Sequence, residues 1–158
     1  MEHSRGADSG STVQLNGLAR IAQQHLCVHD LIAVQAQTTS DAIALVAGSK
    51  RFTYGQLNAS ANQVAHFLRA KEVGPEILVG LCVKRSVEMV VAMLGILKAG
   101  GAYIPIDPNN PTERQLFEVQ DSGTKVLATT DDFAKTLSAD DRTVVRLDAD
   151  WPEIAQER

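Results

Sequence analysis

Two neighbouring segments of the chain are apolar around their whole surface, and they restrict the fold more than any other feature. Residues 77–83 are apolar throughout, without the alternation that marks a strand with one wet face. Such a run is typical of a strand covered on both faces, as in a parallel sheet. Residues 87–98 are nearly all apolar over the length of a helix, so this helix is also expected to be largely buried. Both features together require a sheet with helices packed on it.

The residues around the apolar helix predict how it joins two strands. Ser86 is placed to cap its first turn, and Gly100 with Gly101 ends it before a second strand at 102–106. The connection from the first strand is long enough for a helical crossover, so the two strands should be parallel. Pro105 cannot donate a ladder hydrogen bond, which places it at a strand end or a sheet edge.

The other elements are predicted from turn and capping residues. Gly48 and Ser49 separate two short extended runs, which predicts a tight hairpin over 42–52. Thr53 and Gln56 have capping-box spacing, so a helix should begin there and stop at the Gly-Pro pair 74–75. Further predicted elements are a short helix at 29–37, a helix with Asn110 as its N-cap and Pro111 at its first position, strands at 125–129 and 143–147, a short helix from Asp131 and a turn from Trp151. This order predicts an α/β fold, a three-layer unit with a mostly parallel sheet and flanking helices.

Charge and composition exclude several classes of function. The chain has 15 basic and 19 acidic residues, a net charge of −4, and no basic block, so it lacks the positive surface that nucleic-acid binding needs. The longest apolar run, 89–97, is about half a membrane span, and residues 1–12 lack the apolar core of a signal peptide. We therefore expect a cytoplasmic protein that binds neither nucleic acid nor membrane. Cys27 and Cys82 are interpreted as buried apolar residues, with a disulfide as the alternative.

Few side chains point to chemistry of their own. Residues 9–12 have the composition of a phosphate-binding loop, but the glycine and lysine that should follow are missing. Residues 122–125 include a lysine between a helix end and a strand start, where the helix dipole repels phosphate. Lys84 and Arg85 end a strand at the edge where α/β folds bind ligands, although a solvated turn is the favoured interpretation. The four histidines, His3, His25, His29 and His66, show no metal-ligand spacing. No catalytic, cofactor-binding or metal-binding residue is assigned.

Several stretches together carry a family resemblance: 52–58, 79–83, 86–91, 97–107, 108–111 and 121–123. From about Val28 to Thr130 the chain resembles the N-terminal portion of an amino-acid adenylation domain of nonribosomal peptide synthetases, in the acyl-adenylate-forming (AMP-dependent synthetase and ligase) superfamily. Residues 52–58 are similar to the first core motif of that family, and residues 97–107 to the second, nearly residue for residue. Ser40 stands where the family usually has a proline. The motifs are specific for the superfamily but distinguish its peptide synthetases from its acyl-CoA ligases less clearly, so the acyl-CoA ligase branch is an alternative.

The resemblance implies an activity for the complete domain and a structural role for this part of it. The family activates an amino acid with Mg-ATP, forms an aminoacyl-adenylate and passes the acyl group to a phosphopantetheine carrier protein. The ATP-binding loop, the amino-acid pocket and the catalytic lysine would follow Arg158, so no residue here matches them, and the chain is truncated before them. We expect a scaffold portion that needs no cofactor itself, does not catalyse the reaction alone, and has the remainder of the domain or a carrier-protein module as partner. The two core motifs present are interpreted as architectural.

Two alternatives and a domain division complete these expectations. The chain could be a non-catalytic interaction piece of a split synthetase, in which a separately encoded C-terminal portion completes the fold by adding strands at an open sheet edge. It could also be a truncated or decayed gene product. Residues 1–25 are expected to be a polar, disordered leader, residues 26–150 the partial adenylation domain, and residues 151–158 a tail.

Overall fold

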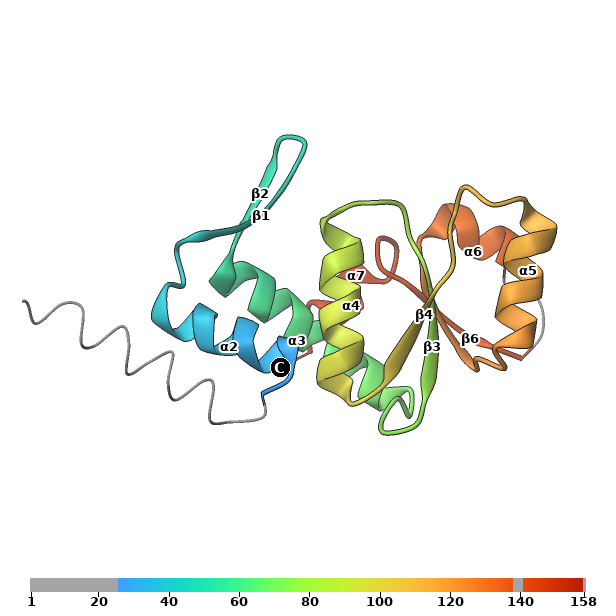
Figure 1. The fold of residues 1–158 in the computed structure, drawn as a ribbon, viewed down its shortest axis with the longest axis horizontal. Coiled ribbons are helices and arrows are strands. Elements are labelled where there is room, and N and C mark those ends of the chain that lie inside the picture. Colours follow the sequence, from blue (N-terminus) through green and yellow to red (C-terminus); the bar gives the residue numbers. More distant parts are fainter. Residues whose placement is uncertain (1–25, 138–140, 158) are drawn as a thin grey trace, which may run out of the picture.

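The centre of the molecule is a sheet of four parallel strands in the order β4-β3-β5-β6. The computed structural model describes residues 26–137 and 141–157, so the expected leader at 1–25 lies outside the described residues. The strands are β3 (Leu78–Cys82), β4 (Ala102–Pro105), β5 (Val126–Thr129) and β6 (Thr143–Arg146), and the helices that join them are α4 (Val87–Ala99), α5 (Thr112–Asp121) and α6 (Asp131–Leu137). Helix α4 lies on one side of the sheet and helices α5 and α6 lie on the other (Figure 1). The predicted three-layer α/β fold is confirmed.

Each face of the sheet contributes to a separate apolar core. Successive strand residues point to opposite faces, and in β3 the side chains of Val79 and Leu81 belong to the larger core while Cys82 belongs to the smaller one. Leu127 of β5 joins the smaller core, under α5 and α6. Burial on both faces explains why β3 and β5 read as continuous apolar runs rather than alternating ones.

Helix α3 (Tyr54–Ala70) packs closely against α4 and fixes the outer layer on that side. A Cβ atom at Gly95 would lie only 2.4 Å from Cγ1 of Val64, so the two helices meet at a position where only a hydrogen fits. The Lys98 ammonium donates to the side-chain oxygens of Asn58 and Asn62, each at 2.8 Å. Burial lowers the pKa of Lys98. Helix α3 is thus held to α4 by both close packing and polar contacts.

The predicted hairpin and capping box are confirmed. Strands β1 (Ile43–Ala47) and β2 (Lys50–Thr53) pair antiparallel across a two-residue turn in which Gly48 has a φ of 60°. The backbone N–H of Gln56 donates to Oγ1 of Thr53 at 3.2 Å, and the Thr53 N–H donates to Oε1 of Gln56 at 3.0 Å. This reciprocal cap starts α3 directly after β2, and helix α2 (Val28–Thr38) lies beside α3 (Figure 1).

The two glycines after α4 each have a structural reason. Gly100 ends the helix in the left-handed region with a φ of 94°, which suits a residue without Cβ. Gly101 donates its backbone N–H to the carbonyl of Ile96 at 3.0 Å, and a Cβ there would lie 2.8 Å from Cγ1 of Val73. The stretch that resembles the second core motif therefore ends a helix and starts a strand, as interpreted.

The structure corrects one predicted cap and places the last segment. Helix α5 begins at Thr112, so Pro111 rather than Asn110 is the N-cap residue, in an extended conformation with a ψ of 144°. The Asn110 carbonyl instead accepts a hydrogen bond from the buried side-chain amide of Gln115 at 2.6 Å. Helix α7 (Trp151–Ile154) lies in the segment expected as a tail, and its Ile154 is completely buried in the larger core.

Candidate functional site at the carboxyl edge of the sheet

A cavity of about 540 Å³ opens where the parallel strands end. Its floor is formed by residues that directly follow three strands: Val83 and Lys84 after β3, Thr130 after β5, and Leu147 with Asp148 after β6. In open α/β sheets, ligands bind in the crevice outside the carboxyl ends of the strands. This cavity is therefore the candidate functional site of the described residues.

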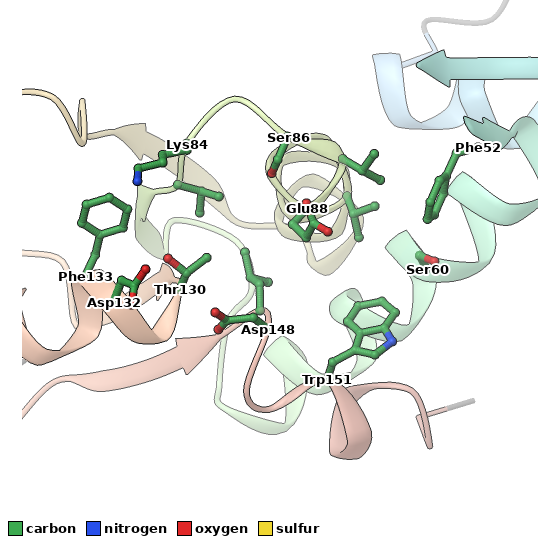
Figure 2. A pocket seen from close by; sticks show the side chains of 14 residues that line it. Phe52, Ser60, Lys84, Ser86, Glu88, Thr130, Asp132, Phe133, Asp148 and Trp151 are labelled. Atoms are coloured by element: carbon green, nitrogen blue, oxygen red, sulfur yellow. The ribbon is translucent and has the colours of Figure 1, made fainter. Parts of the chain in front are cut away.

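Aromatic side chains from three distant elements form the walls of the cavity (Figure 2). Phe52 of β2 and Trp151 of α7 lie at one end, and Phe133 of α6 lies at the other, next to Lys84. The Lys84 ammonium stands 5.4 Å from the centre of the Phe133 ring, within the range of a cation–π contact. The cavity thus has apolar ends and a cation that already faces an aromatic ring.

The first turn of α4 contributes polar groups that already have partners. The Ser86 hydroxyl accepts the backbone N–H of Met89 at 3.3 Å, which caps the helix as predicted. The Glu88 carboxylate accepts a hydrogen bond from the Lys50 ammonium at 2.8 Å, and this pair ties the hairpin to α4. Burial raises the pKa of Glu88, but the hydrogen bonds from Lys50, the backbone and Ser86 outweigh it, so the pKa lies below its ordinary value.

The groups at the ends of β5 and β6 also hold the fold. The buried Thr129 hydroxyl donates to the Cys82 carbonyl at 2.7 Å and joins the ends of β5 and β3. The Asp148 carboxylate accepts the backbone N–H of Asp131 at 3.0 Å, which joins the loop after β6 to the start of α6. Arg146 pairs with Asp150 at 2.6 Å. Burial raises the pKa of the Cys82 thiol to about 11, with smaller effects from neighbouring carboxylates, so this cysteine is not an activated nucleophile.

The charges that line the cavity do not fit a triphosphate. Three carboxylates, Glu88, Asp132 and Asp148, face it together with the single ammonium of Lys84. Phosphate sites instead gather cations and free backbone N–H groups, and the N–H groups of Met89 and Asp131 are already bonded to side chains. In the described part of the chain, the cavity can accept an apolar group, while Ser86, Glu88 and Asp148 make hydrogen bonds that hold the fold.

The residues that the sequence offered as candidates for phosphate or metal binding lie in different parts of the structure. Lys84 lines the cavity, and Arg85 is exposed beside it. Residues 122–125 lie between α5 and β5, at the opposite end of the sheet, where they border a second cavity of about 560 Å³. His66 is half-buried on α3. Residues 9–12, His3 and His25 lie outside the described residues.

The two cysteines have different environments. Both are free, Cys82 is buried as predicted, and Cys27 is exposed. The interpretation of Cys27 as a buried residue is wrong because it is the N-cap of α2, at the end of a helix that has no fully buried residue. Sequence reasoning also missed the aromatic walls, because Phe52, Phe133 and Trp151 come from segments that carry no common pattern.

Comparison with known proteins identifies the family. Residues 32–157 match the family model described as AMP-binding enzyme. The chain belongs to this family. Two of its relatives are components of the linear gramicidin synthase of Brevibacillus parabrevis, one 48% identical over 131 residues and the other 44% identical over 143 residues, which covers 83% and 90% of this chain. The chain spans only 3% of the length of either component. The resemblance to the N-terminal portion of a nonribosomal peptide synthetase adenylation domain is confirmed.

Solved structures agree with this placement. The nonribosomal peptide synthetase FmoA3, in its form bound to alpha-methyl-L-serine-AMP, superposes with a TM-score of 0.77 at 32% identity, over 84% of this chain and 15% of that chain. O-succinylbenzoate coenzyme A synthetase of Bacillus subtilis shares the fold, with a TM-score of 0.70 at 24% identity over 80% of this chain and 32% of that chain. The identities of 48% and 44% to the linear gramicidin synthase components and of 32% to FmoA3 favour the peptide synthetase branch. Among the described residues, no helix is both long and apolar enough to cross a bilayer.

Proposed function

We propose that this chain is the scaffold portion of an amino-acid-activating, AMP-forming adenylation domain of nonribosomal peptide biosynthesis, and that it does not catalyse the reaction alone. The observation that carries the proposal is the family match over residues 32–157, together with 48% identity to a component of linear gramicidin synthase over 131 residues. Within this role, residues 26–150 form the core of the partial domain and the protein acts in the cytoplasm.

The cavity at the carboxyl edge supports a structural role for the described residues. The Ser86, Glu88 and Asp148 side chains are bonded within the chain, while Phe52, Phe133 and Trp151 offer apolar surface. We infer that the remainder of the domain covers this edge and supplies the groups that hold Mg-ATP and the amino acid. The acyl group then passes to a phosphopantetheine carrier protein, which is the further partner of the complete domain.

The test is amino-acid-dependent exchange of pyrophosphate into ATP, measured on two proteins. The first is the purified chain of 158 residues with a mixture of amino acids, and we expect no exchange above the blank. The second is this chain joined to the region that follows the matching segment in the linear gramicidin synthase component with 48% identity, with the unaltered synthase segment as the positive control. We expect the fusion to recover exchange, because this chain supplies a closely related scaffold.

Two outcomes contradict the proposal. Exchange by the isolated chain would show that it carries its own catalytic groups. A fusion that is folded by circular dichroism but inactive, beside an active control, would show that this scaffold does not support the reaction. A third arm mixes the two parts as separate polypeptides, and recovery there would favour the alternative of a split synthetase.

A further inference from the structure

Three side chains of different metal-ligating types meet at the first turn of α2. The thiol of Cys27, the imidazole of His29 and the carboxylate of Asp30 each offer one ligand atom, and these atoms all lie within 4.8 Å of one another. Familiar zinc spacings do not reveal this group, because the three residues are nearly adjacent in sequence. The helix start gathers them, since Cys27 is the N-cap and Asp30 is the third helical residue.

One of the distances matches that between two ligands of a coordinated ion. Nε2 of His29 lies 3.7 Å from Oδ1 of Asp30. Bonds of about 2.0–2.3 Å to a tetrahedral zinc place neighbouring ligand atoms roughly 3.3–3.7 Å apart. The ligand atoms of all three side chains lie within 4.8 Å of one another, so a bound ion would require them to approach somewhat more closely.

The Asp30 carboxylate is already oriented for this role. The backbone N–H of Cys27 donates to Oδ2 of Asp30 at 3.0 Å, which leaves Oδ1 directed toward His29. Carboxylate ligands are commonly held in this way by a hydrogen bond to the oxygen that does not bind the metal. The hydrogen bond that caps the helix thus also fixes one candidate ligand.

The other two side chains have capacity that the fold leaves open. Cys27 is a free, exposed thiol. Nδ1 of His29 is buried and has no hydrogen-bond partner among the described residues, although the side chain as a whole is 23% exposed. Nε2 is the candidate ligand atom of His29, because it is the ring nitrogen that lies 3.7 Å from Oδ1 of Asp30, and the missing partner of Nδ1 is independent of the ion.

We propose that Cys27, His29 and Asp30 bind one zinc ion, with water at the fourth position. One sulfur, one nitrogen and one oxygen ligand suit zinc, whereas calcium and magnesium prefer oxygen alone. The ammonium of Lys98 lies near enough to interact with Asp30, and its positive charge opposes a bound cation. The site is therefore weaker than a closed structural zinc site. It is separate from the cavity at the sheet edge and does not depend on the proposed function.

The sharpest variant is Cys27→Ser. Serine is a preferred N-cap residue, so this change removes the thiolate while it keeps the start of α2. Asp30→Glu keeps a capping-box residue at the third position but displaces the carboxylate. His66→Gln is the matched control, because His66 is half-buried on α3 and belongs to no such group among the described residues.

The experiment titrates Zn²⁺ into the full chain in competition with a chromophoric chelator, and Co²⁺ as an optical substitute. We expect one Zn²⁺ per chain and a thiolate-to-cobalt charge-transfer band. Cys27→Ser should lose the band and weaken zinc binding at least about tenfold, whereas His66→Gln should bind as the unaltered chain does. Circular dichroism checks that each variant is folded. Absence of stoichiometric binding, or equal affinity in the unaltered chain and Cys27→Ser, would overturn the proposal.

Discussion

Replacement of Gly95 by alanine tests the close contact between α3 and α4. Gly95 is buried in the middle of α4, where its missing side chain faces Val64 of α3. An added Cβ would lie 2.4 Å from Cγ1 and 2.7 Å from Cβ of Val64. The second of these atoms is fixed to the α3 backbone, so a rotation of the valine side chain cannot relieve both contacts. The helices must move apart to accept the methyl group.

The expected cost follows from two opposing effects. Alanine stabilises a helix interior by about 1 kcal/mol relative to glycine. Overpacking of a tight core costs about 1–3 kcal/mol and sometimes more. Both contacts are shorter than real Cβ atoms tolerate, and one involves an atom fixed to the backbone. We therefore place the overpacking cost at the upper end of its range, so Gly95→Ala should lower the free energy of unfolding by roughly 1–2 kcal/mol.

The assay is urea unfolding followed by circular dichroism, with two matched comparisons. Gly74→Ala is the control, because a Cβ there meets nothing within 4 Å and the backbone is ordinary, so it should be neutral or stabilise by about 0.4–1 kcal/mol. Val64→Ala removes the Cγ1 atom that makes the shorter contact and keeps the Cβ atom, so the double variant with Gly95→Ala should be less destabilised than the sum of the single changes. A fully stable Gly95→Ala, or strict additivity in the double variant, would refute this account of the interface.

Three further predictions concern two buried threonines, the two cysteines and the Lys50–Glu88 pair. Thr124→Val should be neutral or stabilise by up to about 1 kcal/mol, because the buried Thr124 hydroxyl has no partner among the described residues. Thr129→Val should cost about 1 kcal/mol by losing the bond to the strand end, so the urea midpoint should fall for Thr129→Val and should not fall for Thr124→Val. Timed alkylation with mass spectrometry at pH 8 should modify exposed Cys27 long before Cys82, whose pKa burial raises to about 11, and equal rates would contradict the burial. The pKa of Glu88 in the folded chain lies below its ordinary value of 4.5. The Glu88 carboxylate should therefore stabilise the fold fully above pH 4.5 and lose this effect as the pH falls through the folded pKa. Glu88→Gln should reduce the loss of unfolding free energy in acid by less than about 1 kcal/mol.

The fold was predictable where its cause is local in the sequence. Gly48 sets the hairpin turn, Thr53 with Gln56 starts α3, and Gly100 ends α4, and in each case neighbouring residues decide the outcome. The parallel sheet followed from uninterrupted apolar runs joined by helical crossovers. The predicted N-cap of α5 was wrong by one residue. The carbonyl of Asn110 accepts a hydrogen bond from the side chain of Gln115, five residues further on.

The candidate site was predictable only in part, because tertiary contacts make it. The position of Lys84 at the carboxyl edge follows from a general rule for parallel sheets. The aromatic walls do not, since Phe52 and Trp151 are about a hundred positions apart and only the tertiary fold places them at one cavity. The cluster of Cys27, His29 and Asp30 at the start of α2 was not predicted for the opposite reason. These residues are so close in sequence that they do not show the spacing of familiar metal-binding motifs.

The hydrogen bonds at the carboxyl edge give a physical reason for a scaffold role that does not rest on similarity to other proteins. A ligand that binds there through the Asp148 or Glu88 carboxylate would compete with the bond from Asp131 to Asp148 or with the Lys50–Glu88 pair. Each of these joins two elements of the fold, so breaking them loosens the sheet edge itself. Covering the aromatic side chains of Phe52 and Trp151 with apolar surface would break no such bond and would be favourable by roughly 25 cal/mol per Å². The edge is therefore suited to be covered by protein, which is the role that the scaffold proposal gives it.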